Sequence, residues 1–129
     1  MTFRRNNEFL AAIRKEAARR VERGTEIVRD GAKAKMDREG TGRTYTWLPR
    51  QASAPGEPPV TQLGGLAASL RTYPVRHSDT EVAGATGSDV EVLWRLEAGD
   101  IQTEPRPLLM PSLLESKPEI MAVMGGRDE

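Results

Sequence analysis

The stretch NEFLAAIRKEAARRVERGTEIVRDGAKAK, residues 7–35, decides the fold of this chain. Apolar or small residues recur in it at steps of three and four, which is the spacing of one face of an α-helix. We therefore predict one long helix over 7–35 with one buried side and one charged side. The buried side carries Leu10, Ile13, Ala17, Val21, Gly24, Val28 and Gly31, and the charged side carries Lys15, Arg19, Glu22, Arg23, Glu26, Asp30 and Lys33.

Two glycines stand on the buried side of this predicted helix. Gly24 and Gly31 each lower helix propensity by about 1 kcal/mol relative to alanine. The helix could therefore bend or restart at Gly24–Thr25. Alternatively, Ala17, Gly24 and Gly31 lie seven residues apart, so that their small side chains let another segment approach closely. The sequence leaves both interpretations open.

The length of the helix sets a second expectation. A helix of about 29 residues runs roughly 43 Å, whereas a compact domain of 129 residues has a radius of gyration of about 14 Å. One end should therefore project beyond the rest of the chain. Because a projecting half-apolar helix leaves a large exposed patch, we expect it to pack on another subunit.

A segment rich in proline and glycine follows the helix. Residues 37–42, DREGTG, end the helix, and residues 45–48 form a short extended stretch before Pro49. Four of the five residues from Pro55 to Pro59 are proline or glycine, which excludes a helix or a central strand. We predict an extended arm over 49–63 that lies on a neighbouring subunit; a plain surface loop fits the composition equally well.

The remaining sequence predicts a small sheet and a last helix. Residues 64–98 read as a short helical turn followed by strands at 71–76, 81–85 and 90–96, with Pro74 marking an edge or a bulge. The strand at 90–96 carries the clearest alternation, with Trp94 on the core side. A C-terminal helix follows over 107–124, kinked or restarted at Pro118. The predicted fold is a single α+β domain, residues 1–129, in which the long N-terminal and the C-terminal helix pack on a small, mainly antiparallel sheet.

Composition excludes several classes of protein. The chain has no cysteine, so it has neither a disulfide framework nor a thiolate metal site. It has no apolar run near twenty residues and no signal-peptide pattern at residues 1–7, so we expect a soluble protein inside a cell or an assembled particle, without a membrane partner. The charge is uneven: residues 1–50 hold 13 basic and 7 acidic side chains, and residues 51–129 hold 6 and 12. Such asymmetry fits either nucleic acid or copies of one chain that meet basic face to acidic face.

Residue patterns that carry catalysis are missing from the sequence. His77 is the single histidine, and no serine has a histidine-plus-acid context. Neither Gly40-Thr41-Gly42 nor the glycines at 84 and 87 continue into a phosphate-binding loop. We therefore expect no enzyme activity, no catalytic, cofactor-binding or metal-binding residues, no cofactor and no small-molecule substrate.

The basic residues of the long helix suggest an alternative function. Lys15, Arg19, Arg23 and Lys33 form a partial stripe that a small nucleic-acid-binding regulator could use. Glu22, Glu26 and Asp30 lie on the same side, however, and interleaved acids weaken attraction to phosphate. A mixed, solvated face is the favoured interpretation of this side.

Several short motifs together resemble a known family. They are residues 53–59, SAPGEPP; Gly64 or Gly65 followed by Leu66 and Ser69-Leu70; residues 96–99, LEAG; and residues 106–113, RPLLMPSL. In this order and spacing they are similar to the tail-component family of long-tailed bacteriophages, in which a basic amphipathic helix precedes such an arm, turn, strands and helix start. The resemblance spans the chain from the first helix to Leu114.

The resemblance implies a structural role without a reaction. It implies a virion protein of the neck or tail, present in the host cytoplasm during assembly, that forms a homo-oligomeric ring of six subunits. Its partners would be the head connector and the tail tube or terminator, with DNA passing through the lumen. A head-to-tail ring needs two complementary surfaces on each copy, and we hypothesise that Arg50, Arg71 and Arg106 face Glu57, Glu97 or Glu104 across the seam. The hypothesised interface comprises Arg50, Pro55, Gly56, Glu57, Pro58, Pro59, Arg71, Glu97, Arg106 and Leu108.

Overall fold

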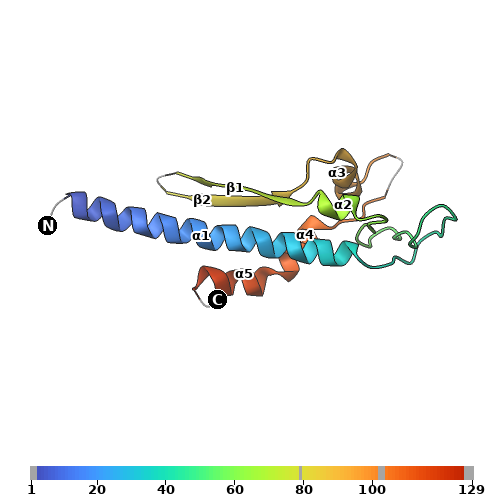
Figure 1. The fold of residues 1–129 in the computed structure, drawn as a ribbon, viewed down its shortest axis with the longest axis horizontal. Coiled ribbons are helices and arrows are strands. Elements are labelled where there is room, and N and C mark those ends of the chain that lie inside the picture. The colour runs from blue at the N-terminus through green and yellow to red at the C-terminus, as the bar shows by residue number, and fades with distance from the viewer. Residues whose placement is uncertain (1–2, 79, 102–103, 127–129) are drawn as a thin grey trace.

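The computed structural model describes residues 3–78, 80–101 and 104–126. These residues form a mixed α+β fold, as predicted: a long N-terminal helix, a small antiparallel sheet and C-terminal helices (Figure 1). The elements in chain order are α1 (Phe3–Met36), α2 (Gly65–Ala68), β1 (Arg71–His77), β2 (Val82–Gly87), α3 (Glu91–Ala98), α4 (Leu109–Glu115) and α5 (Lys117–Met124).

Helix α1 is the axis on which the other elements are arranged. The hairpin of β1 and β2 lies along one side of it and α5 along another (Figure 1). The helix continues through Gly24, so the restart that the sequence allowed there is not observed. A Cβ added at Gly24 would lie 3.6 Å from Ile120 Cγ2, and one at Gly31 would lie 3.6 Å from Ser116 Oγ. Both distances are ordinary van der Waals contacts, so the C-terminal segment lies against α1 at these glycines without requiring them, and the close-approach interpretation stays a prediction.

The N-terminal turns of α1 project beyond the rest of the chain, as the length argument predicted (Figure 1). Every side chain from residue 7 to residue 15 is exposed. Phe9 is 66% exposed and Ile13 is 49% exposed, although Ile13 belongs to the stripe that is buried further along the helix. The apolar face of α1 is therefore covered over its C-terminal half and open at its N-terminal end.

The sheet consists of the two predicted strands at residues 71–87. They pair antiparallel, with Arg71 opposite Gly87 and His77 opposite Val82, and the register shifts between Tyr73 and Arg76. Pro74 lies inside this shift. Because proline has no N–H to donate to the ladder, the irregularity falls where the sequence predicted it.

The predicted strand at 90–96 is wrong, because these residues form helix α3. Leu93 is fully buried, while Trp94, expected in the core, is 46% exposed. A short apolar run fits a strand and a helix equally well, and local contacts here favour the helix. Arg95 pairs with Glu91 one turn away at 2.9 Å, and Gly99 with φ 76° ends the helix.

The predicted C-terminal helix is two helices, α4 and α5, that meet at Ser116. Pro118 lies in the first turn of α5, where its missing N–H is not needed for a helical hydrogen bond. The predicted restart is therefore confirmed. Arg20 of α1 donates to the carbonyl oxygen of Met124 at 2.8 Å, which ties the end of α5 to α1.

The segment 49–63 contains neither helix nor strand, but a projecting arm is not observed. The Glu57 carboxylate accepts hydrogen bonds from the N–H of Ala54 at 2.7 Å and of Thr41 at 2.9 Å. These bonds, that from Ala54 first, lower the pKa of Glu57. The Thr61 N–H donates to the Met36 carbonyl oxygen at 2.9 Å, and Pro59 is buried. A segment without a ladder of its own is thus fixed by contacts within its own chain.

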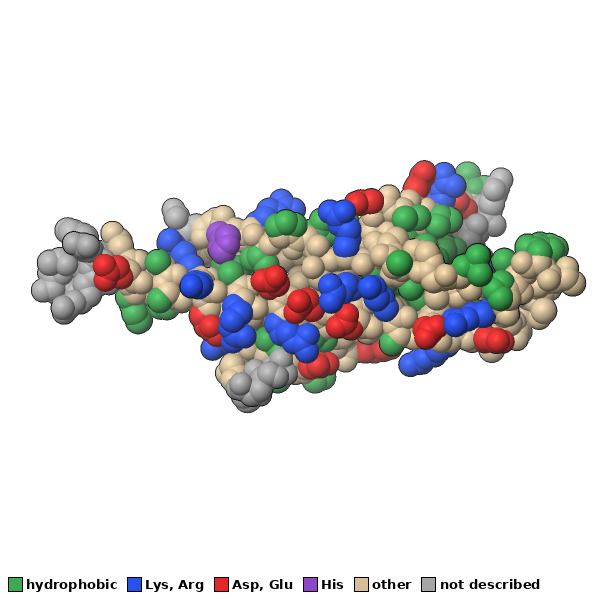
Figure 2. Space-filling view, in the orientation of Figure 1, with side chains coloured by type: hydrophobic (Ala, Val, Ile, Leu, Met, Phe, Trp, Pro, Cys, Tyr) green, Lys and Arg blue, Asp and Glu red, His purple; other side chains and the backbone are tan. Residues whose placement is uncertain are grey.

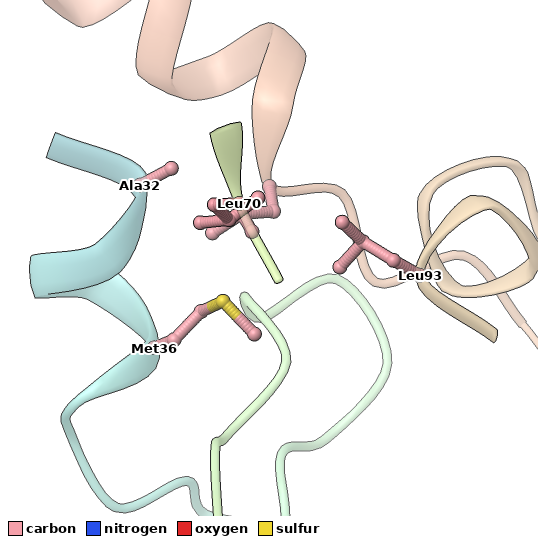
Figure 3. Close-up of a cluster of buried hydrophobic side chains, with 5 residues drawn as sticks. Ala32, Met36, Leu70 and Leu93 are labelled. Carbon is pink, nitrogen blue, oxygen red and sulfur yellow. The ribbon is translucent and has the colours of Figure 1, made fainter. Parts of the chain in front are cut away.

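The hydrophobic core gathers at the C-terminal end of α1 (Figure 3). Leu66, Ala67 and Leu109 are partly buried and pack against it. The Lys35 ammonium pairs with Glu115 of α4 at 2.7 Å beside this core. Its buried members are Ala32, Met36, Leu70, Leu93 and Leu108.

Candidate interaction surfaces

Two of the predicted interface residues stabilise the fold of one copy. The Glu97 carboxylate accepts hydrogen bonds from the N–H groups of Leu108 and Leu109, both at 2.8 Å, and of Met110 at 3.1 Å. It thereby satisfies the donors that the N-terminus of α4 leaves open, and its charge suits the positive end of the helix dipole. Leu108 is fully buried. Within one copy, Leu108 is thus enclosed and the Glu97 carboxylate is bonded to its own backbone, while a role for either residue between copies stays a prediction.

The three arginines of the hypothesised seam find partners within their own chain. Arg50 pairs with Asp37 at 2.7 Å and Arg71 with Asp89 at 2.8 Å. The Arg106 guanidinium donates to the carbonyl oxygens of Ser53 at 3.4 Å and Glu104 at 3.3 Å. Because acids or carbonyls close in the fold are already in contact with them, a pairing across subunits would require these contacts to exchange.

The proline-rich part of the hypothesised interface is largely turned inward. Pro55 and Gly56 form an exposed turn, whereas Pro58 is half-buried and Pro59 is buried. Gly56 has φ 88°, a conformation that favours glycine. Its N–H donates to the carbonyl oxygen of Pro105 at 2.9 Å. Of residues 55–59, the turn at 55–56 is therefore the part that faces solvent.

The structure contains an apolar groove that the sequence did not predict. Its volume is about 400 Å³, and it lies where β2, α4 and α5 meet the middle of α1. Trp94 of α3 and Met110 and Leu113 of α4 line it, and all three are 44–57% exposed. Val21 and Val28 line it from α1. We call these surfaces together the groove.

Close packing of the hairpin on α1 shapes this groove. A Cβ added at Gly84 would lie 2.7 Å from Thr25 Cγ2 and 2.8 Å from Val21 Cγ1, so no larger residue fits there without a shift. The Thr86 hydroxyl donates to the Thr25 carbonyl oxygen at 2.7 Å. The Trp94 indole N–H donates to the carbonyl oxygen of Ser88 at 2.6 Å, which fixes the ring at the groove. Met110 of α4 and Met124 of α5 also line the groove.

A second open apolar surface lies on the projecting turns of α1. Phe9, Leu10 and Ile13 are all exposed there. Leu10 and Ile13 continue the stripe that includes Val21, because steps of three and four residues keep side chains on one helix face. We call Phe9, Leu10 and Ile13 the terminal stripe.

The charged side of α1 is a mixture of both signs (Figure 2). Glu16 accepts hydrogen bonds from Arg19 and Arg20, and the Arg19 contact is the largest cause of lowering the Glu16 pKa to about 2. Further along, Arg23 lies 3.8 Å from Glu26 and Arg29 lies 3.1 Å from Asp30. The interpretation as a mixed face is consistent with these pairs, which reduce the charge available to phosphate.

The described part of the chain offers no metal centre and no membrane span. None of its clusters combines three or more histidine, cysteine, aspartate or glutamate side chains in a way that could hold a metal ion. Within residues 3–78, 80–101 and 104–126, none of the helices has the length and apolar character needed to cross a membrane. Comparisons with protein-family models, curated proteins and solved structures gave no match.

Proposed function

We propose that this chain is a structural subunit that acts by associating with copies of itself. More specifically, we propose a neck or tail-completion subunit of a long-tailed bacteriophage, assembled as a ring in the virion. The resemblance of residues 53–59, 96–99 and 106–113 to the phage tail-component family supports the specific assignment.

The observation that carries the proposal is the pair of open apolar surfaces. The terminal stripe and the groove both expose large apolar side chains, among them Phe9, Ile13, Trp94 and Leu113. An exposed apolar surface of this kind marks a site of protein association. Two different surfaces on one copy suit head-to-tail assembly, which closes into a ring when the rotation between copies allows it.

The charge distribution favours association over nucleic-acid binding. The acids of α1 lie beside its arginines, as in the pairs of Glu16 with Arg19 and Arg20. A helix that binds duplex DNA gains its affinity from basic groups that replace the counterions of phosphates. Residues 16–30 of α1 hold four basic and four acidic side chains, so this part of the helix lacks a strongly basic face. Nucleic-acid binding is the competing outcome of the test.

Sedimentation of the purified full-length protein over a range of concentrations tests the proposal. We expect a species larger than a monomer, and images of it by negative-stain electron microscopy should show closed rings. A protein that stays monomeric at every concentration and binds duplex DNA with a steep salt dependence would overturn self-association and support the regulator.

The phage assignment has a test of its own. Reading frames beside the gene should encode portal, capsid or tail-tube proteins, and the protein should be found by mass spectrometry in purified particles from the same genome. A self-associating protein that is missing from such particles would refute the phage role while leaving self-association intact.

A further inference from the structure

We propose that the terminal stripe of one copy binds in the groove of the next copy. This inference deepens the proposed function, because it rests on self-association, but it does not depend on the phage assignment. It names the two surfaces and the direction of assembly: the N-terminal turns of α1 are the donor, and the groove between β2, α4 and α5 is the acceptor.

The donor has the spacing of a helix that binds in a groove. Phe9 and Ile13 are one turn apart, and Leu10 lies between them on the adjoining part of the face. Anchors at such spacings are how amphipathic helices dock into apolar grooves. All three are exposed in the chain by itself, so docking would remove apolar surface from water without disturbing the core.

The acceptor has matching chemistry. The groove of about 400 Å³ is lined mainly by apolar side chains and by the small residues Gly24, Gly84 and Ala85. Gly24 and Gly84 already face Ile120, Val21 and Thr25 of the same chain, so Ala85, which is exposed, is the small residue open to a partner. Met110 and Met124 add flexible thioether side chains that adapt to an incoming shape.

The occupant must come from another molecule. Val21 and Val28 of α1 form part of the groove, and α1 is continuous from Phe3 to Met36. The terminal stripe is thus held on the same rigid helix, about 12 Å from Val21 when measured from Ile13 at 1.5 Å per residue. It cannot fold back into its own groove without breaking that helix.

The charges of the two regions are complementary. Residues 7–20 hold four basic and two acidic side chains, whereas the helices α3, α4 and α5 together hold two basic and four acidic ones. The donor region is therefore positive and the acceptor region negative by the same amount. Such complementarity steers association and fixes which surfaces meet, and it favours a second copy over an unrelated apolar segment.

Two substitutions and their matched controls test this inference in the full chain. Ile13→Glu places a carboxylate in the donor, with Ala11→Glu on the opposite helix face as the control of equal charge. Leu113→Arg blocks the acceptor, with Leu114→Arg as the control, because Leu114 is 62% exposed and does not line the groove. We expect each of the two test variants to lose the assembled species in sedimentation, and both controls to assemble like the wild type.

Mixing the two defective variants gives the decisive readout. Ile13→Glu retains an intact groove and Leu113→Arg retains an intact stripe, so an equimolar mixture should form a 1:1 dimer and nothing larger. An interface of any other kind would not restore pairing in this way. Circular dichroism of each variant checks that the fold is kept, as expected for exposed positions.

The outcomes separate this inference from the proposal beneath it. If the wild type assembles and Ile13→Glu and Leu113→Arg assemble equally well, copies associate through other surfaces and the donor–acceptor assignment is wrong. If each variant fails to assemble but the mixture stays monomeric, the two surfaces do not bind one another. If the wild type itself is monomeric, self-association fails as well.

Discussion

The two halves of α1 carry the same kind of face but meet different surroundings. From Gly24 to Met36 the stripe is covered by the hairpin, α4 and α5, and it ends in the core beside Leu70 and Leu93 (Figure 3). From residue 7 to residue 15 it is exposed. The apolar stripe thus extends beyond the part of α1 that the other elements of the same copy cover. Periodicity therefore predicts which side of the helix is covered, but not whether the same copy or another molecule covers it.

The largest expected effect is the loss of packing at the covered end. Met36→Ala should reduce the free energy of unfolding by about 2–5 kcal/mol, because the side chain is fully enclosed in the core and its removal leaves a cavity. Urea unfolding at a protein concentration low enough to keep the chain monomeric measures this, since association adds stability of its own.

The matched substitution in the exposed N-terminal half of α1 is Ile13→Ala. It should change the free energy of unfolding by less than about 0.5 kcal/mol. Equal losses of stability for Met36→Ala and Ile13→Ala would mean that the N-terminal turns are covered within one copy.

A smaller loss of stability is expected at the N-terminus of α4, which is one of the elements that cover α1. Glu97→Ala removes the carboxylate that accepts three backbone N–H groups at the start of α4. We expect a loss of about 1–3 kcal/mol, as for hydrogen bonds to a charged group at a helix N-terminus. Thermal unfolding measures the loss, with Glu104→Ala at an exposed position as the control. A loss no greater than that of Glu104→Ala would show that α4 is held by its apolar contacts alone.

The sequence predicted the parts of this comparison that are encoded locally. Helix α1 followed from a periodic run of 29 residues, and the bulge at Pro74 followed from a missing N–H. The eight-residue helix α3 was mistaken for a strand, because so short an apolar run satisfies both periods. Propensity and pattern lose their power where an element is about two turns long.

Of the two surfaces in the proposed contact, the terminal stripe was predictable from the sequence and the groove was not. The open N-terminal turns followed from helix length alone. The groove takes its walls from α1, β2, α3, α4 and α5, so it exists once five separate segments are placed in space. The contact of Glu97 with the start of α4 joins residues 96–99 to residues 106–113, two of the short motifs, but neither motif indicates that they meet. The sequence therefore contains the Glu97 carboxylate but does not indicate which groups it contacts.

One substitution in the covered half of α1 is expected to raise the free energy of unfolding. Gly24→Ala should stabilise the monomer by about 0.5–1 kcal/mol, because alanine has the higher helix propensity and the new Cβ would meet Ile120 Cγ2 at 3.6 Å, an ordinary contact. Urea unfolding measures this gain. A loss instead would show that α5 packs more tightly on α1 than the structure gives. Gly84→Ala is the contrasting variant, since its Cβ would lie 2.7 Å from Thr25 Cγ2 and should destabilise.

The smallest expected effect concerns the loop beside the covered end of α1. The pKa of Glu57 is lowered from 4.5, because the carboxylate accepts from the backbone N–H groups of Ala54 and Thr41. A lowered pKa in the folded chain means that the stabilisation is full above the ordinary value and is lost as the pH falls through the folded one. Below about pH 4.5 the wild type should therefore lose stability faster than Glu57→Gln, which has no carboxylate to protonate at this site.

Comparison of the two proteins cancels the contribution of other carboxylates, including Glu16, whose pKa is also lowered. The amide signals of Ala54 and Thr41 followed by NMR against pH report the same event locally, and both should move together in the wild type and stay still in Glu57→Gln. Parallel stability curves for the two proteins would mean that the loop is fixed by the bond from Thr61 to Met36 and by the burial of Pro59, and not by the carboxylate. The loop would then keep its place at this end of α1 when the Glu57 carboxylate is protonated.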